Sequence, residues 1–176
     1  MANILYNAKQ LSELIDMLTA QLMPRMNANV VFVGIIQGGE ILANRVAQAI
    51  GAKIGSQIPV GSLDISFYRD DISTKGIEIT SKPSQIDFTI EGKEVILFDD
   101  VLYHGRTIRA ALNSLFDFGR PAKVELAVLI DRGHRELPIT PDYVAMKKDV
   151  VSNEIIHVKF SEVFGHDSVE SEQNDQ

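Results

Sequence analysis

Two adjacent acids open the stretch of this sequence with the clearest chemical pattern. Asp99 and Asp100 follow the apolar run 94–98, which predicts a short buried strand, and the loop after them leads into an amphipathic helix predicted over 107–118. Amide groups at a helix N-terminus lack helical partners and lie at the positive end of the helix dipole, so they bind phosphate. Carboxylates accept hydrogen bonds from vicinal hydroxyls. The junction therefore predicts a site for a phosphorylated sugar.

Each of these residues also has a purely structural interpretation. The two acids could simply end a strand, and Thr107 could cap the helix or donate its hydroxyl to a phosphate. For any one residue the two interpretations have equal weight, whereas the whole string favours a binding site. The chain has neither a G-x-x-x-x-G-K-[ST] nor a G-x-G-x-x-G motif, which argues against an ordinary nucleoside triphosphatase or dehydrogenase.

The rest of the chain predicts the elements that position this junction. Strands and helices alternate, which indicates an α/β fold with a mainly parallel sheet covered on both faces, and ligands of such sheets bind beyond the carboxyl ends of the strands. A polar stretch, 70–91, is either a long loop or a mobile hairpin that could act as a lid. The first predicted helix spans 9–23 and is ended by Pro24. A second helix is predicted to follow the turn at Gln37 to Gly39 and to end near Gly51. The further predicted strands are 30–36, 62–67, 124–130 and 156–160.

Composition narrows the class of protein. The chain has 176 residues, 45% hydrophobic and 23% charged, which predicts one globular domain. It contains no Cys and only four His, which excludes disulfides and a cysteine nucleophile and leaves little room for a zinc site. No apolar run is long enough for a membrane span and no signal peptide opens the chain, so we expect a cytoplasmic protein without membrane contact.

The acidic charge is concentrated at the C-terminal end. Of the net charge of −7, −5 lies within 161–176, which has five acids and no Lys or Arg, and −2 remains for the rest of the chain. We therefore predict a single domain over 1–160 and an acidic, solvated and disordered tail over 161–176. A balanced domain could still carry a local basic face.

The string VILFDDVLYHGRTIRAAL over 95–112 resembles the phosphoribosyl pyrophosphate (PRPP) motif of type I phosphoribosyltransferases. The sequence is most similar to the PyrR family of pyrimidine-operon regulators and uracil phosphoribosyltransferases. Further blocks that carry this resemblance are IPVGSLDISFYRDD over 58–71, FGRPAKVELAVLIDRGHRELPI over 118–139, and PDY over 141–143. The resemblance extends in order from about Val31 to Phe160 and implies a type I fold with a flexible hood.

It also implies a reaction in which uracil and PRPP give UMP and pyrophosphate. Asp99 and Asp100 would bind the ribose hydroxyls as the catalytic pair, and Mg²⁺ would be held chiefly by PRPP oxygens and water. UMP or UTP would be further ligands, pyrimidine-leader RNA a further partner, and a homodimer or higher oligomer the assembly. The positions implied in binding PRPP or nucleotide are Gln37, Gly38, Arg69, Val101, Leu102, Tyr103, His104, Gly105, Arg106, Thr107, Arg132 and Ile156.

Two departures from the family pattern concern catalysis. His104 replaces a usual Thr, and Gln37 with Gly38 replaces the more common Thr-Arg of the pyrophosphate loop. These changes remove a hydroxyl and a guanidinium that could bind phosphate oxygens, so we expect weaker PRPP binding.

Other departures concern RNA. The predicted first helix has no Arg, and two expected cations are replaced by Thr140 and Met146. His134 and Arg135 keep part of the RNA-binding pattern, although packing at a strand end would explain them equally well. Because RNA affinity depends on neutralising phosphates, the sequence favours the enzyme over the regulator. Three hypotheses stay open: a uracil phosphoribosyltransferase, a nucleotide-sensing RNA attenuator with little turnover, and a PRPP-binding protein that has lost catalysis.

Overall fold

The computed structural model describes residues 3–68, 82–148 and 154–173. Its main sheet is fully parallel, with strand order β3-β2-β4-β5-β6. These strands are β2 (Val30–Ile35), β3 (Val60–Leu63), β4 (Glu94–Leu102), β5 (Lys123–Asp131) and β6 (Tyr143–Lys147). The predicted parallel sheet of an α/β fold is confirmed.

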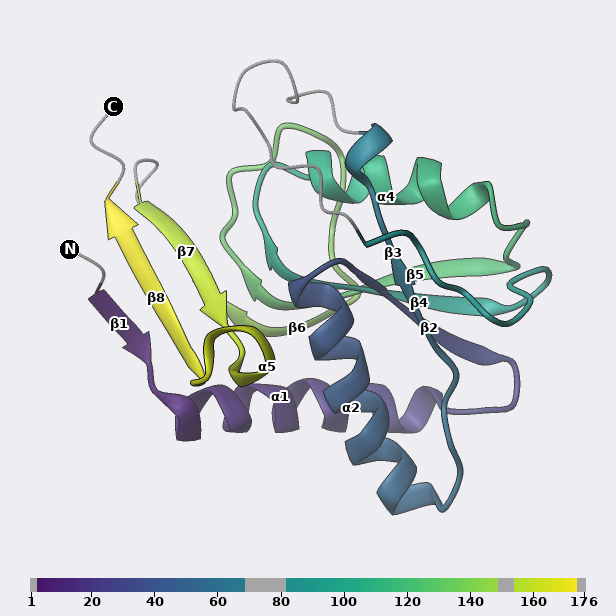
Figure 1. The fold of residues 1–176 in the computed structure, drawn as a ribbon, viewed down its shortest axis with the longest axis horizontal. Coiled ribbons are helices and arrows are strands. Elements are labelled where there is room, and N and C mark those ends of the chain that lie inside the picture. Colours follow the sequence, from purple (N-terminus) through teal and green to yellow (C-terminus); the bar gives the residue numbers. More distant parts are fainter. Residues whose placement is uncertain (1–2, 69–81, 149–153, 174–176) are drawn as a thin grey trace.

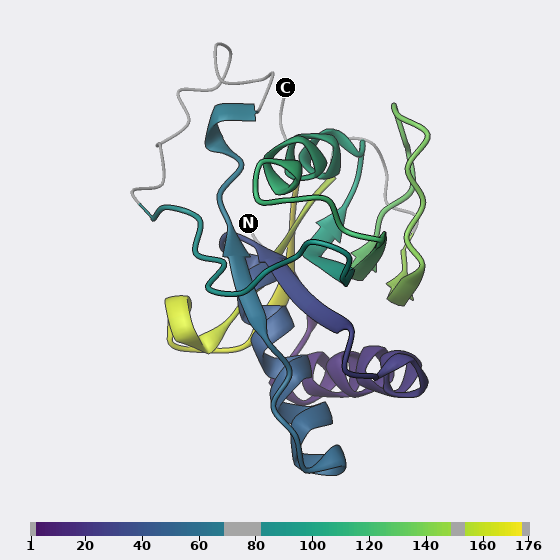
Figure 2. The ribbon, with the colours of Figure 1, turned by 90° about the vertical axis from the view of Figure 1, so that its right-hand side faces the viewer.

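Helices cover both faces of this sheet (Figures 1 and 2). α1 (Ala8–Leu22) and α2 (Gly38–Ile54) pack on one face, and α4 (Arg106–Phe116) packs on the other. Each face has its own apolar cluster, centred on fully buried residues such as Phe32 and Phe98 on one side and Leu97 and Leu115 on the other. Short 3-10 helices, η1 (Met23–Arg25) and η2 (Ser66–Tyr68), follow α1 and β3.

A second sheet is antiparallel and lies beside the first. It has the order β1-β8-β7, formed by β1 (Asn3–Tyr6), β7 (Glu154–Lys159) and β8 (Ser168–Gln173), with the four-residue helix α5 (Ser161–Phe164) between β7 and β8. The predicted strand over 156–160 is therefore present, but it belongs to this sheet and is not the last strand. The sequence did not reveal which sheet this strand belongs to, because a strand with alternating buried and exposed residues has the same pattern in either sheet.

The prediction of a disordered tail over 161–176 is wrong for residues 161–173. β8 pairs along its length with β7 and over part of it with β1, and Val169 is fully buried. The acids of this segment are used inside the fold: the buried Glu170 accepts hydrogen bonds from Lys159 and Ser168. Three acids of this segment, Glu162, Asp167 and Glu170, thus form ion pairs within the fold.

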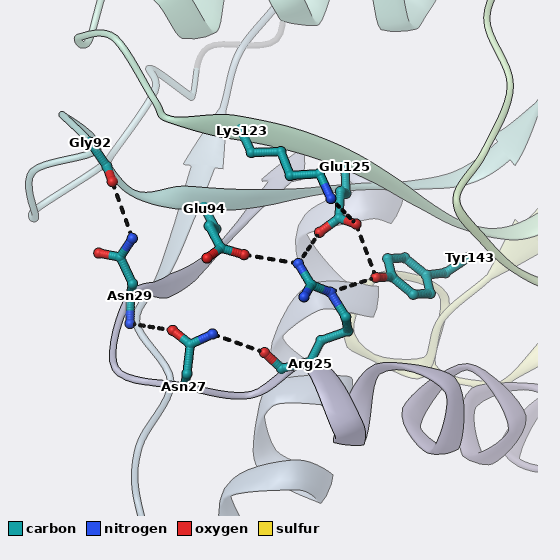
Figure 3. Close-up of polar contacts among 8 residues, drawn as sticks. All are labelled: Arg25, Asn27, Asn29, Gly92, Glu94, Lys123, Glu125 and Tyr143. Atoms are coloured by element: carbon teal, nitrogen blue, oxygen red, sulfur yellow. Dashed lines mark hydrogen bonds and ion pairs between the residues drawn. The ribbon is translucent and has the colours of Figure 1, made fainter.

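An ion-pair cluster joins the amino ends of the sheet strands, opposite the predicted site (Figure 3). Arg25 Nη2 lies 2.8 Å from a Glu94 carboxylate oxygen and 2.7 Å from Glu125 Oε2. Lys123 Nζ and the Tyr143 hydroxyl also donate to Glu125, at 2.8 and 3.2 Å. Burial raises the pKa of the Glu125 carboxyl, but the hydrogen bonds from Lys123 and Arg25 outweigh that effect and lower the pKa overall.

This lowered pKa predicts an acid-sensitive contribution to stability. A group whose folded pKa is depressed stabilises the fold above its unfolded pKa and loses that contribution as the pH falls through the folded value. Arg25→Ala should therefore lower the melting temperature most at neutral pH, and the difference from the parent should shrink below about pH 4. Thermal unfolding followed by circular dichroism across pH 3 to 8 measures this. A pH-independent difference would contradict it.

Candidate phosphoribosyl-transfer site

Asp99 and Asp100 lie within β4 near its carboxyl end, rather than after it, because the strand continues to Leu102. β2 pairs with β4 only as far as Phe98, so the sheet opens beside the two acids. The Asp100 amide donates to Asp99 Oδ1 at 3.0 Å, and the Val101 amide donates to Asp100 Oδ1 at 2.9 Å. An opening between neighbouring parallel strands is where ligands of such sheets bind.

The two carboxyls differ in exposure. Asp99 is 6% exposed, whereas Asp100 is partly exposed toward the opening. Burial raises the pKa of the Asp100 carboxyl, and the hydrogen bond from Val101 opposes that shift only in part. An ionised Asp100 is thus poorly compensated inside the protein. Hydroxyl donors or a cation entering with a ligand would supply the missing stabilisation.

The start of α2 brings Gln37 and Gly38 against this pair. A Cβ placed on Gly38 would overlap the Asp100 carboxyl, with its Cγ only 2.5 Å away. A Cβ on Gly39 would overlap the backbone of Phe98, 2.9 Å from its carbonyl carbon. The peptide between Ile36 and Gln37 is cis. The close approach of helix and strand therefore requires Gly39, and Gly38 leaves room for the Asp100 side chain.

The loop after β4 leads into α4 as predicted, but the cap differs. Gly105, with a φ of 92°, is the N-cap, and no side chain caps the helix. Thr107 is the second helical residue, so it does not cap the helix. Its side chain lines the cavity beside the acids, where its hydroxyl and the first-turn amides can meet an anion.

One cavity of about 380 Å³ is lined by some of the residues that the sequence predicted to bind substrate. Asp99, Asp100 and Thr107 line it from one side, and β7 and α5 line it from the other. A neighbouring cavity of about 330 Å³ adds Ile156 and shares Asp100 and Val101 with the first. The predicted residues that line either cavity are Gln37, Gly38, Asp99, Asp100, Val101, Thr107 and Ile156.

Other predicted residues lie outside both cavities. Leu102 is 1% exposed and packs in the core below α4, so its predicted contact with substrate cannot involve the side chain. Tyr103 and His104 stack on each other with ring centroids 3.6 Å apart, and Arg106 pairs with Glu136 at 2.6 Å. Arg69 lies outside the described residues.

Arg132 is almost completely buried. Its guanidinium carbon lies 3.8 Å from the Tyr103 ring centroid, and it donates to the Glu154 carbonyl. Burial lowers its pKa, and among the described residues its buried Nε has no hydrogen-bond partner. The arrangement connects the loop between β4 and α4, which begins at Tyr103, to β7, the strand that carries Ile156.

Arg135 makes an internal network. Its guanidinium donates to the carbonyls of Tyr103 and Ile139 at 2.8 and 2.9 Å and pairs with Asp131 at 2.6 Å. These contacts fix the loop that packs on Gly105 and favour the packing interpretation of Arg135. His134, by contrast, is exposed and has a φ of 53°. RNA contact by either residue stays a prediction.

Arg135→Ala should lower the free energy of unfolding by about 1–3 kcal/mol, because buried carbonyl groups lose their donor. We also expect weaker PRPP binding, since Tyr103 begins the loop between β4 and α4 that we predict to bind the 5′-phosphate. Chemical denaturation and calorimetric titration with PRPP measure the two effects. His134→Asn is the control, because Asn tolerates the left-handed backbone. Equal stability of Arg135→Ala and the parent would contradict the structural role.

The structure also brought together residues that the sequence did not single out. Asp64 and Ser66 line the larger cavity beyond β3, and Phe160, Val163 and Phe164 form its far wall. The pair Val163 and Phe164 was a usable signal, because adjacent large apolar side chains are uncommon in a solvated tail. Among the described residues, no group of three or more His, Cys, Asp or Glu is arranged to hold a metal ion, and no helix could cross a membrane.

The parallel sheet, the paired aspartates and the helix N-terminus beside them define a phosphoribosyltransferase domain. The family model of the phosphoribosyl transferase domain matches residues 1–167. A hypoxanthine phosphoribosyltransferase of Trypanosoma cruzi superimposes with a TM-score of 0.71 at 14% identity, covering 98% of this chain and 97% of that one. At that identity the likeness shows the fold alone.

Proteins of similar sequence identify the family within the phosphoribosyltransferases. The chain is 49% identical over 148 residues to the bifunctional protein PyrR of Limosilactobacillus reuteri, covering 83% of each chain. It is 42% identical over 166 residues to the bifunctional protein PyrR of Nostoc punctiforme, covering 93% of each. The chain belongs to the PyrR family of phosphoribosyltransferases.

Proposed function

We propose that this protein transfers a phosphoribosyl group from PRPP to uracil, giving UMP and pyrophosphate. The observation that carries the proposal is the single cavity lined by Asp99 and Asp100 of β4 and by Thr107 in the first turn of α4. Membership of the PyrR family supports uracil as the acceptor. The pocket chemistry supports a phosphorylated sugar independently of that resemblance.

Different residues of the site bind different parts of the substrates. The first turn of α4 with Thr107 binds the 5′-phosphate, and the two carboxylates accept hydrogen bonds from the ribose hydroxyls. As the bond from the anomeric carbon to pyrophosphate breaks, positive charge develops on the ribose, and the nearby carboxylates stabilise it. A ring nitrogen of uracil forms the new bond to that carbon and releases its proton to the departing pyrophosphate. We place the base on the side of the smaller cavity, which contains Ile156.

Mg²⁺ fits this donor set. The cavity offers the hard carboxylate oxygens of Asp99 and Asp100, and the raised pKa of Asp100 reflects burial that a nearby cation would offset. The ion would supply charge neutralisation of the pyrophosphate. Asp99 and Asp100 would offer it carboxylate oxygens, and PRPP oxygens and water would supply most of its ligands.

Gln37 and His104 make PRPP binding weaker than a Thr-Arg loop and a Thr would make it. His104 Nδ1 lies 3.6 Å from Glu136, so this carboxylate stands close to the phosphate loop. A double variant, Gly38→Arg with His104→Thr, tests the idea only in part, because Gly38 cannot carry a side chain without moving Asp100. The single variant His104→Thr is the cleaner test: an unchanged PRPP dissociation constant would remove the hypothesis for that position.

The test of function is a base panel. The protein is incubated with PRPP, Mg²⁺ and each of uracil, cytosine, hypoxanthine, guanine and adenine, and nucleotide and pyrophosphate are measured. Formation of UMP and pyrophosphate in equal amounts with uracil is expected. Turnover of another base only would overturn uracil, and Mg²⁺-dependent PRPP binding without turnover of any base would identify a protein that has lost catalysis.

A second function is supported by the word bifunctional in the names of the relatives. We propose that the protein also binds leader RNA of a pyrimidine operon in response to UMP or UTP. Binding that weakens with salt and strengthens with UMP would support this role. No binding to that leader at low salt would contradict it.

We further propose a cytoplasmic homodimer or higher homo-oligomer, as the family resemblance implies. Sedimentation velocity at several protein concentrations tests the assembly. A monomer at micromolar concentration with full activity would contradict it.

A further inference from the structure

We propose that Arg45 is a positioning residue that holds the far wall of the cavity in place for the acceptor base. The far wall is formed by Phe160, Val163 and Phe164, which line the cavity opposite Asp99 and Asp100. Arg45 belongs to α2 and is not among the residues that line the cavity. Figure 1 shows α2 next to α5. The inference deepens the proposed function, on which the identity of the base rests.

Arg45 binds both ends of the segment that carries the wall. Its Nε and Nη2 donate to the two Glu162 carboxylate oxygens at 2.9 and 2.5 Å. Nη1 and Nη2 each donate to an Asp167 carboxylate oxygen at 2.8 Å, and Nη2 also reaches Ser161 Oγ at 3.1 Å. A single planar guanidinium therefore joins two carboxylates in geometry that an ammonium group cannot reproduce.

The same group also acts on the wall directly. The Arg45 guanidinium carbon lies 4.9 Å from the centroid of the Phe160 ring, a distance typical of a cation–π contact. Phe160 is 1% exposed and lines the cavity. Asp167, held by Arg45, in turn accepts the Ser161 amide at 2.7 Å, which fixes the first residue of α5.

The α5 part of the wall needs this support because, unlike the buried Phe160, it packs weakly. α5 has only four residues, too few to be stable as an isolated helix. Val163 and Phe164 are 48% and 50% exposed, so apolar burial holds them only in part. The polar contacts of Arg45 with Ser161, Glu162 and Asp167 therefore tie α5 to α2.

One helix consequently sets both sides of the cavity. α2 begins at Gly38, which lies against Asp100, and two turns later it presents Arg45 to α5. Phe164 borders both cavities, including the smaller one with Ile156, so displacement of the wall changes the space for the base. The 5′-phosphate and ribose are held by α4 and the aspartates, which Arg45 does not contact.

Because Arg45 contacts the wall on the base side and not the groups that hold phosphate and ribose, we can predict which kinetic constant changes. Arg45→Ala should raise the KM for uracil, and kcat/KM for uracil should fall by about 10- to 100-fold, the range expected when a group is misplaced by about 1 Å. The dissociation constant of PRPP, measured by calorimetry without a base, should change less than about threefold.

Arg25→Ala is the matched control. Arg25 also pairs with two carboxylates at 2.7 and 2.8 Å, but its cluster lies at the opposite edge of the sheet. Both variants should unfold at a lower temperature than the parent, and assays run well below both melting temperatures should show a raised KM for Arg45→Ala alone. Equal KM values for uracil in the two variants would overturn the positioning role.

Arg45→Lys keeps the test decisive where Arg45→Ala does not fold. The lysine can pair with Glu162 or Asp167 but not bidentately with both, so the KM for uracil should lie between those of the parent and a variant without the contacts. A parental KM in Arg45→Lys would overturn the proposal. If the base panel shows that the parent uses another base, the same comparison is made with that base, so failure of the uracil assignment and failure of the Arg45 role give different results.

Discussion

Asp100→Asn is expected to abolish most activity and yet raise thermal stability at neutral pH. The amide keeps an oxygen for the hydrogen bond that the Val101 amide donates at 2.9 Å. It removes the negative charge that would face the ribose, so kcat/KM should fall on the order of 10²-fold. A variant that loses activity but gains stability indicates that the original side chain is kept for catalysis although its environment destabilises it.

The sign of the stability change follows from the pKa. Burial raises the folded pKa of Asp100 above its unfolded value, so folding favours the protonated form. The contribution of this group to stability is present below the unfolded pKa and is lost as the pH rises through the folded pKa. At neutral pH the ionised carboxylate is therefore a net cost to folding, which the neutral Asn removes.

The measurement is the melting temperature of variant and parent from pH 3 to pH 8. The gain should be largest near neutral pH and vanish in acid, where the parent carboxyl is also neutral. Glu13→Gln, an exposed position on α1, is the control and should alter neither stability nor turnover. A lower melting temperature of Asp100→Asn at neutral pH would contradict the assignment.

Gly38→Ala and Gly39→Ala are expected to fail in different ways, although they are neighbours in the first turn of α2. The Cβ of Gly39→Ala would meet the backbone of Phe98, which cannot move without opening the contact between α2 and β4. We expect a loss of about 1–3 kcal/mol in the free energy of unfolding, typical of overpacking. The higher helix propensity of Ala acts in the opposite direction, so any loss comes from the contact.

The Cβ of Gly38→Ala would instead meet the Asp100 side chain, which can rotate away. This variant should keep more of its stability but lose PRPP affinity and turnover, by up to about 10²-fold for a displacement near 1 Å. Urea denaturation and PRPP titration of both variants give the comparison. Parental PRPP affinity in Gly38→Ala would show that the carboxylate position is not set by this contact.

The local part of the site was predictable because it is contiguous in sequence. An apolar run, two acids and a glycine-containing loop before a helix describe β4, its carboxyl end and α4, and each step depends on neighbours within a few residues. The exact strand end was not predictable: Val101 and Leu102 extend β4 because β5 offers them partners at Ile130 and Asp131.

The C-terminal segment was not predictable for the opposite reason. Its acids suggested a solvated tail, but Glu162 and Asp167 are satisfied by Arg45, and Glu170 is satisfied by Lys159. Those partners come from α2 and β7, and only folding brings them together. Charge counted along a sequence cannot distinguish a solvated carboxylate from one that has a distant cation.

The sequence alone determined the parallel α/β class, the acidic pair and the glycine-containing loop that starts α4, because hydrophobic periodicity and helix-end chemistry are local. Only the tertiary structure decided which side chains meet. It brought Gly38 against Asp100, placed Leu102 in the core, occupied Arg135 with backbone carbonyls, and set the wall of Phe160, Val163 and Phe164 opposite the acids. These contacts depend on the packing of α2 and the second sheet, whose energies come from residues far apart in the chain.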